Sequence, residues 1–263
     1  MVRYLKLVKT LFRQSMQREL AFRANFGVNV IHSTLHLVGG VGGVVVLFAH
    51  SDTLNGWDFS QTLALLGVYL LVQSLKNLFI GPSLAALAGL DGHLWTGEFD
   101  FTLLKPVPTQ VLVSLQAWSP WALVDTLLSI VVIGLAMRTA GVPHCGDLLL
   151  FLLSLFAALG LLYAILLFLA AVAFWYLGTP MMWIFDSILQ MGRFPIRIYP
   201  HSMSLILTWV IPVGFIVTIP AEFLSGQGTA MLLLPGFALS GLLVGLASHF
   251  FRVSVRRYSS ASS

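Results

Sequence analysis

Hydrophobic residues gather in six long stretches along the chain, separated by short polar segments, at residues 26–48, 60–80, 114–137, 148–173, 203–223 and 229–250. Each stretch has the roughly 20 residues that a helix needs to cross the hydrocarbon core of a bilayer. A transmembrane barrel would instead alternate polar and apolar residues in segments of about ten. The pattern predicts an all-α integral membrane protein with six transmembrane helices in one domain, residues 1–263.

The first 24 residues show a different pattern. At helical spacing, one face is apolar and the adjoining face is polar, with the members Leu5, Val8, Phe12 and Met16 against Lys6, Lys9, Arg13 and Gln17. This pattern predicts an amphipathic interfacial helix over residues 1–24, bound by apolar burial and by attraction to anionic head groups. We do not expect a signal peptide, because the next apolar stretch is long enough to span and no small-residue cleavage site follows it.

Composition supports a lipid environment. Hydrophobic residues make up 58% of the chain and charged residues only 9%, whereas soluble domains average about 25% charged residues. The net charge of +4 does not predict a nucleic-acid partner, since the cations lie at the ends of the apolar stretches and form no patch. We expect the lipid bilayer to be the main partner.

The positions of the cations predict an orientation. Lys and Arg accumulate in the cytoplasmic loops of membrane proteins. With a cytoplasmic N-terminus and six spans, only Arg138 of the 14 Lys and Arg residues faces outward, and the others fall inside, namely Arg3, Lys6, Lys9, Arg13, Arg18, Arg23, Lys76, Lys105, Arg193, Arg197, Arg252, Arg256 and Arg257. We therefore expect a multi-pass protein of the cell (inner or plasma) membrane with both termini cytoplasmic, cytoplasmic loops at 81–113 and 178–200, and outer hinges at 51–58, 141–147 and 225–228.

The sequence offers no catalytic group. No lysine follows a glycine, so the phosphate-binding loop Gly-x-x-x-x-Gly-Lys-[Ser/Thr] is missing and any ATP must bind to another polypeptide. No serine or cysteine comes with a base and an orienting acid, and the single Cys145 excludes an internal disulfide. We expect no enzyme activity and no cofactor.

His32, His36 and Asp125 lie well inside predicted spans. His32 and His36 are one helical turn apart, but two ligands are too few for a zinc site, so we expect no metal and read them as packing residues or a polar spot in a path. Asp125 lies in the third stretch, where a carboxylate costs about 2.5–3.5 kcal/mol on insertion scales. It either lines a substrate path or proton relay, or hydrogen-bonds to a neighbouring helix.

The segment after the second stretch mixes acids, aromatic residues and turn formers. Residues 82–90 favour a helix that continues from the membrane, and Asp91-Gly-His-Leu-Trp-Thr-Gly97 has a turn former at each end. A short cytoplasmic helix that presents Trp95 and charged neighbours to a soluble partner would use this mixture.

Here the sequence resembles the permease subunits of type-2 ABC exporters, in the branch with six spans and a separately encoded ATPase. Three places carry the resemblance: Gly97-Glu-Phe-Asp100 leading into Leu103-Leu-Lys-Pro-Val107, Phe194-Pro195 with Tyr199-Pro200, and Ile211-Pro212-Val213 with Pro220-Ala221. The resemblance implies that two permease chains, identical or sister, pair with two cytosolic ATPase subunits.

The resemblance also implies roles for particular residues. The loop between the second and third spans would hold the coupling helix at about residues 84–100, with the candidate contacts Asp91, Gly92, His93, Trp95, Gly97, Glu98 and Asp100. Asp125 is the candidate residue of the translocation path.

Three other functions would leave different features in the sequence. A stand-alone, ion-coupled carrier would show inverted repeats and paired broken helices with mid-membrane ionisable groups, whereas one Asp125 and no visible repeat argue against it. A lipid-modifying membrane enzyme would need a nucleophile or a metal cluster, and neither is visible. A membrane scaffold stays open as an alternative.

Overall fold

The computed structural model describes residues 2–21, 23–89, 91–141 and 144–258, and within them every regular element is a helix. The all-α prediction is confirmed. The elements are α1 (Val2–Ala21), α2 (Arg23–Phe48), α3 (Phe59–Leu75), η1 (Lys76–Ile80), α4 (Gly81–Ala88), α5 (His93–Thr96), α6 (Phe99–Leu103), α7 (Thr109–Leu115), α8 (Ala122–Ala140), α9 (Cys145–Val172), α10 (Met181–Leu189), η2 (Gln190–Arg193), η3 (Ile196–Ile198), α11 (His201–Leu205), η4 (Ile206–Val210), η5 (Gly214–Thr218), α12 (Ile219–Leu224), η6 (Ala230–Leu232) and α13 (Leu233–Arg256).

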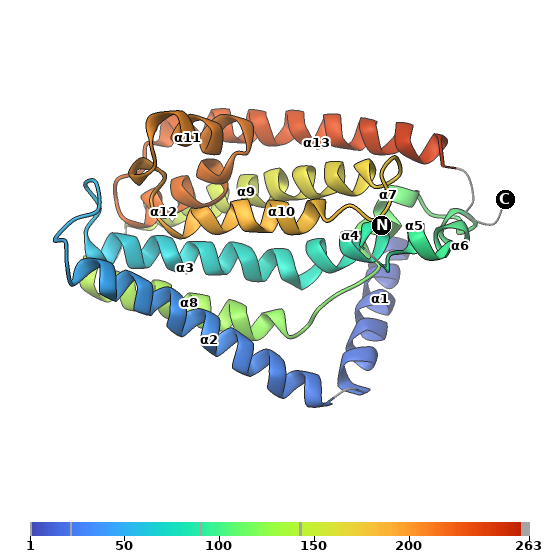
Figure 1. Ribbon diagram of the computed structural model, residues 1–263, viewed down its shortest axis with the longest axis horizontal. Helices are drawn as coiled ribbons and strands as arrows, with labels where there is room; N and C mark the ends of the chain where they lie inside the picture. Colours follow the sequence, from blue (N-terminus) through green and yellow to red (C-terminus); the bar gives the residue numbers. More distant parts are fainter. Residues whose placement is uncertain (1, 22, 90, 142–143, 259–263) are drawn as a thin grey trace.

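The long helices lie side by side in one elongated bundle (Figure 1). Five of them are long and apolar enough to cross a membrane: α2, α3 with its continuation through α4, α8, α9 and α13. We call the end of the bundle with residues 49–58 and 225–232 the hinge end, and the opposite end with α5 and α6 the loop end. In Figure 1 the hinge end is at the left and the loop end at the right.

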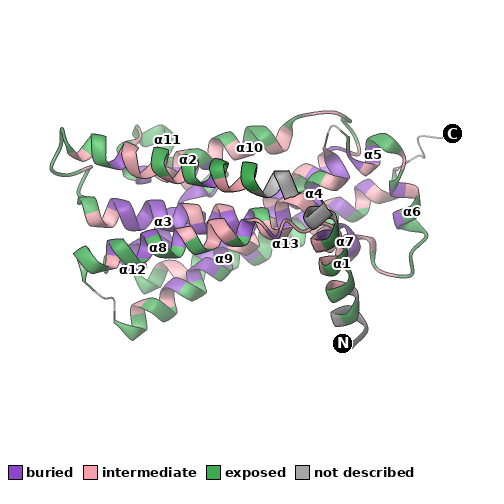
Figure 2. Cartoon of the chain, turned by 90° about the horizontal axis from the view of Figure 1, so that it is seen from below, coloured by how far each residue is buried: buried purple, intermediate pink, exposed green. Residues whose placement is uncertain are grey.

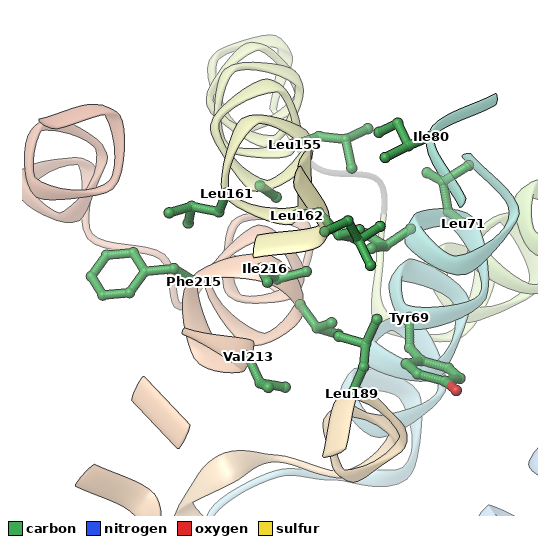
Figure 3. Packing of buried hydrophobic residues seen from close by; sticks show 14 of the residues in the cluster. Tyr69, Leu71, Ile80, Leu155, Leu161, Leu162, Leu189, Val213, Phe215 and Ile216 are labelled. Carbon is green, nitrogen blue, oxygen red and sulfur yellow. The ribbon is translucent and has the colours of Figure 1, made fainter. Parts of the chain in front are cut away.

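Helices α3 and α9 form the centre of the bundle, and α2 and α13 lie at its surface (Figure 2). Side chains from α3, α9, α10 and η5 converge on one apolar core, with Leu71, Leu162, Leu189 and Ile216 among its members (Figure 3). Helices α9 and α13 run parallel and approach closely, since a Cβ on Gly160 would lie 2.3 Å from Ser240 Oγ. Small residues permit such approach where lipid gives no hydrophobic drive to association.

Helix α1 lies across the bundle rather than along it (Figure 1). Phe12 contacts Trp118 edge-on, with ring centroids 5.5 Å apart, and the Trp118 backbone N–H donates to Ser15 Oγ over 3.2 Å. Its cations Lys6, Lys9 and Arg13 are exposed. The amphipathic helix is thus confirmed for the side chains that the structure describes. The side chains of Arg3, Leu5, Arg18 and Arg23 are not among the described ones.

The third span begins later than predicted, at Ala122 rather than at residue 114. The chain breaks between α7 and α8 because Pro120 provides no backbone N–H and disfavours helical geometry in the residue before it. Ser83 holds this break in place, since its hydroxyl donates to the Ala117 carbonyl (2.6 Å) and accepts from the Ala117 N–H (3.1 Å).

Residues 178–200 depart most from the prediction of a loop. Lys76 Nζ lies 2.5 Å from Asp186 Oδ1, and the Arg193 guanidinium lies 5.3 Å from the centre of the Tyr69 ring. Asp186 and Arg193 are seven residues apart, and their partners Lys76 and Tyr69 are also seven residues apart but in the reverse order along the chain. The segment α10 and η2 therefore runs antiparallel to α3.

The same segment ends at the hinge end, because the Asn55 side chain donates a hydrogen bond to the Arg197 carbonyl. Residues 178–200 therefore return through the bundle, and the prediction that they form a loop at the loop end is wrong, since Arg197 lies at the opposite end. The physical reason is that the polar residues of α10 and η2 face a cavity between helices instead of bulk water.

Residues 203–223 are not one straight span. The segments His201–Val210 and Gly214–Leu224 meet at 74°, at a break where Pro212 provides no N–H. A Cβ on Gly192 would lie 3.0 Å from Val213 Cγ1, so the tip of this bent pair reaches the middle of the bundle. Both its ends lie at the hinge end, which makes it re-entrant. We infer that α10 to η3 is the fifth crossing, so that the described residues still cross six times.

Candidate functional site

A cavity of about 1100 Å³ lies between α2, the rod formed by α3, η1 and α4, the start of α8, and α10 with η2. Three of these walls contribute a polar stripe at intervals of three or four residues, and α8 contributes Asp125 alone. The polar lining residues on these helices are Asn29, His32, Ser33 and His36 on α2, Gln73, Ser74, Lys76 and Asn77 on α3 and η1, Asp125 on α8, and Asp186, Gln190 and Arg193 on α10 and η2, while Asp91, Ser119 and Thr179 line the cavity from the connecting segments. Three polar faces and the carboxylate of Asp125 thus meet inside a bundle of apolar helices.

Lys76 and Asp186 form an ion pair in this cavity, at 2.5 Å, with side chains 6% and 38% exposed. A lysine that deep is stable only with a partner of opposite charge, because desolvation of a lone ion costs several kcal/mol. Lys76 opens the π-helical turn η1. Pro82 has no backbone N–H to donate to the Leu78 carbonyl, and the Ser119 N–H donates a hydrogen bond to this carbonyl instead (2.9 Å). The turn thereby ties the α3 rod to the start of α8.

Arg193 lies seven residues after Asp186 on the same wall of the cavity, nearer the hinge end. Its Nη2 is 2.5 Å from His36 Nε2, and its guanidinium stacks on Tyr69. His36 in turn stacks on His32 with ring centroids 6.2 Å apart. No carboxylate lies within ion-pair distance of Arg193 among the described residues, and its buried Nε has no hydrogen-bond partner there. Placing an arginine at this depth in the membrane costs free energy, and such a residue therefore marks a functional site by default.

Asp125 lies in the first turn of α8 and lines the cavity. Within the described part of the chain it makes neither an ion pair nor a hydrogen bond to a neighbouring helix. Of the two readings of Asp125, the geometry favours a residue that faces an internal path. The structure also brings His32 and His36 to this cavity, but without a third ligand: no group of three metal-binding side chains is found in the described residues.

Sequence reasoning missed Lys76, Asp186, Gln190 and Arg193 as members of this site. A signal was present, since Asp186, Gln190 and Arg193 recur at the spacing of one helix face. The signal is weak because the segment around these residues also has the composition of a loop.

The predicted coupling residues lie together at the loop end. Helices α5 and α6 are anchored by Leu94 and Phe99, both buried, and the Phe99 ring packs edge-on against Phe174 and Tyr258 at 5.2 and 5.0 Å. Their outer face carries apolar side chains, with Trp95 59%, Phe101 68% and Leu104 80% exposed. Beside these, His93 Nε2 lies 3.3 Å from Glu98 Oε2, Asp91 and Glu98 are exposed, and Asp100 is half-buried.

Two glycines shape this end. Gly92 has no space for a side chain, because a Cβ there would lie 2.5 Å from the Leu87 carbonyl oxygen. Gly97 has φ +76°, the left-handed conformation that side chains disfavour. Both predicted turn formers are thus needed, one between α4 and α5 and one between α5 and α6.

The cavity and the loop end share one rod. Ala85, Ala88 and Gly89 line the cavity from α4, and Asp91 lines it just before α5 begins. A rigid element therefore connects an exposed surface at one end with the polar residues inside.

A family model described as ABC-2 family transporter protein matches residues 36–262. The chain belongs to the ABC-2 transporter family. This confirms the resemblance drawn from the motifs and makes the protein a multi-pass membrane permease with a role in transport. Searches of curated proteins and of solved structures found no match. The matched range covers the whole of the cavity except the residues contributed by the first part of α2.

Proposed function

We propose that this ABC-2 permease is the membrane subunit of an ATP-driven exporter, and that α5 and α6 dock on a separate cytosolic ATPase. The observation that carries the proposal is the outer face of α5 and α6, where Trp95, Phe101 and Leu104 are exposed beside Glu98 at the tip of the rod that lines the cavity. Exposed aromatic and apolar side chains with charges at their rim are typical of protein interfaces.

The rod supplies a route for force. The described residues include no phosphate-binding loop for ATP, so work has to enter through contact with another chain. Helices α3, η1 and α4 follow one another without a break from the hinge end to Ala88. A rigid-body movement of a docked ATPase would be transmitted along this rod to Lys76 and the cavity. Asp125 and the cavity would form part of the translocation path.

The remaining cations support an orientation for this proposal. The loop end holds Lys105 and the C-terminal part of α13 with Arg252, Arg256 and Arg257, and the cations of α1 lie near it (Figure 1). Arg138 and Arg197 lie at the hinge end. The positive-inside rule therefore supports a cytoplasmic loop end, cytoplasmic termini and residence in the cell membrane. A second permease chain, identical or sister, would complete the transporter.

The test is purification of the tagged protein from its native cells, followed by assay of ATP hydrolysis that vanadate inhibits. We expect the purified complex to hydrolyse ATP. The variant Glu98→Lys should lose most of this activity, because it places a cation on the docking surface and breaks the contact with His93. The matched control is Asp52→Lys, an exposed acid at the hinge end, which should keep the activity. Equal activity in both variants would contradict docking at α5 and α6.

A further inference from the structure

Three charges that line the cavity have no ion partner among the described residues. Asp91 is exposed at the loop end, and the two that lie inside the bundle have opposite sign. Lys76 and Asp186 neutralise each other at 2.5 Å. This leaves Arg193, whose buried Nε has no hydrogen-bond partner, and Asp125, which has no ion pair in the described residues. His36 contacts Arg193 without supplying a negative charge.

The two charges lie at different depths. Arg193 stacks on Tyr69, and Thr126, the neighbour of Asp125, donates to Ser74 Oγ over 3.0 Å. Five residues of α3 separate these two levels, which is about 7.5 Å along the helix axis at 1.5 Å per residue. A ligand that pairs with both residues must therefore carry an anionic and a cationic group that are separated by several bonds.

The cavity also reaches the apolar surface of the bundle. Trp183 lines it from α10 and is 70% exposed, next to Ile184 at 51%. A polar head inside the cavity and an apolar tail over this surface would both be in a favourable environment.

We propose that the cavity binds the zwitterionic head group of an amphiphile, with Arg193 as the partner of a phosphate and Asp125 as the partner of a protonated amine. The guanidinium presents its remaining donors to phosphate oxygens, and the carboxylate accepts from the N–H groups of the amine. A phospholipid with an ethanolamine head group has this chemistry. The proposal deepens the proposed function, since it names the class of molecule for the same cavity.

The test is native mass spectrometry of the full-length protein with three probes of identical acyl chains. Phosphatidylethanolamine carries both charges and N–H donors, phosphatidylcholine carries both charges without N–H donors, and phosphatidylglycerol lacks the cation. We expect preferential retention of phosphatidylethanolamine. Arg193→Gln should weaken retention of all three lipids by about tenfold, the effect of one lost hydrogen bond to a charged group. Asp125→Asn should abolish only the preference for phosphatidylethanolamine.

Two controls keep the result decisive. Arg197→Gln removes an arginine at the hinge end that is not part of the cavity lining and should leave lipid retention unchanged. If Arg193→Gln loses the monodisperse peak in size-exclusion chromatography, the near-isosteric Asp125→Asn decides the outcome. Equal retention of the three lipids by the wild type, or an unchanged preference in Asp125→Asn, would overturn the proposal. No ATPase takes part, so the docking proposal stands or fails separately.

Discussion

Residues 81–113 and 178–200 both leave a long, buried helix at the loop end, and both mix acids, cations and aromatic residues. The first segment stays there and folds into the short helices α5 and α6. The second turns at Gly178, where φ is +75°, and runs back along α3 to Arg197. The two segments have a similar composition, but one stays at the loop end and the other crosses the bundle.

The difference lies in where the polar groups find partners. In 178–200, Asp186, Gln190 and Arg193 share one helix face towards the cavity, while Phe185 and Leu189 pack into the core. In 81–113 the left-handed Gly97 interrupts the helix after four residues, so no polar stripe forms and the charges stay at the exposed end. A polar segment is compatible with the membrane when its charges share a face and meet a partner or a cavity.

The largest expected effect is the all-or-none outcome of a labelling experiment, which tests whether the two segments lie at opposite ends of the bundle. Cys145 is exposed at the start of α9 and is the single cysteine of the chain. We expect a membrane-impermeant maleimide to label Cys145 in intact cells. In a Cys145→Ser background, Ile198→Cys should be labelled in the same way, whereas Trp95→Cys should react only after permeabilisation.

Ile198 suits this purpose because it is 37% exposed and its replacement leaves the Arg197–Glu222 contact intact. If Ile198→Cys reacts only after permeabilisation, as Trp95→Cys should, while Cys145 reacts in intact cells, then residues 178–200 end at the loop end. That outcome would refute the fifth crossing.

A smaller but still large effect is expected at the ion pair that joins the second region to η1. Asp186→Ala leaves the nearly buried Lys76 without its partner, and we expect a loss of about 3 kcal/mol in the free energy of unfolding, as for other broken buried pairs. Thermal unfolding in detergent measures it. The double variant Lys76→Met/Asp186→Leu removes both charges and should regain most of the stability. A double variant as unstable as Asp186→Ala would show that the pair does not hold α10 against α3.

The smallest effects are expected at the turns of the loop end. Gly92→Ala forces a Cβ against the Leu87 carbonyl oxygen and should cost about 1–3 kcal/mol, the range of overpacking. Gly97→Ala should cost about 1 kcal/mol, because alanine disfavours the left-handed conformation. The same unfolding assay ranks the two. Since neither residue lines the cavity, lipid retention should stay unchanged, and a changed lipid preference in either variant would contradict a purely local role.

Much of the fold was predictable from the sequence. The apolar stretches at 26–48, 60–80 and 148–173 correspond to α2, to α3 with η1, and to α9. Segments of this hydropathy are stable only in the protein interior or in lipid, so their sequence alone identifies them. The amphipathic N-terminus and the turn formers Gly92 and Gly97 were also readable, since their signals are local. The bend at Pro212 was visible as a proline but not as a re-entrant pair, because a proline breaks a helix without saying which way the chain continues.

The candidate site was predictable only in part. Asp125, His32 and His36 were singled out because charged or polar residues in apolar stretches are conspicuous. Lys76, Asp186 and Arg193 were not assigned to a site, since each lies at the edge of a stretch or between stretches, where a charge is expected to meet water.

By itself, the sequence determined that the chain is a helical membrane protein with its cations gathered mostly near one end, because hydropathy and charge act residue by residue. Only the tertiary structure decided that residues 178–200 cross the bundle and that three polar stripes meet Asp125 in one cavity. The free energy of a charge in a membrane depends on its partners, and those partners come from helices far away in the chain.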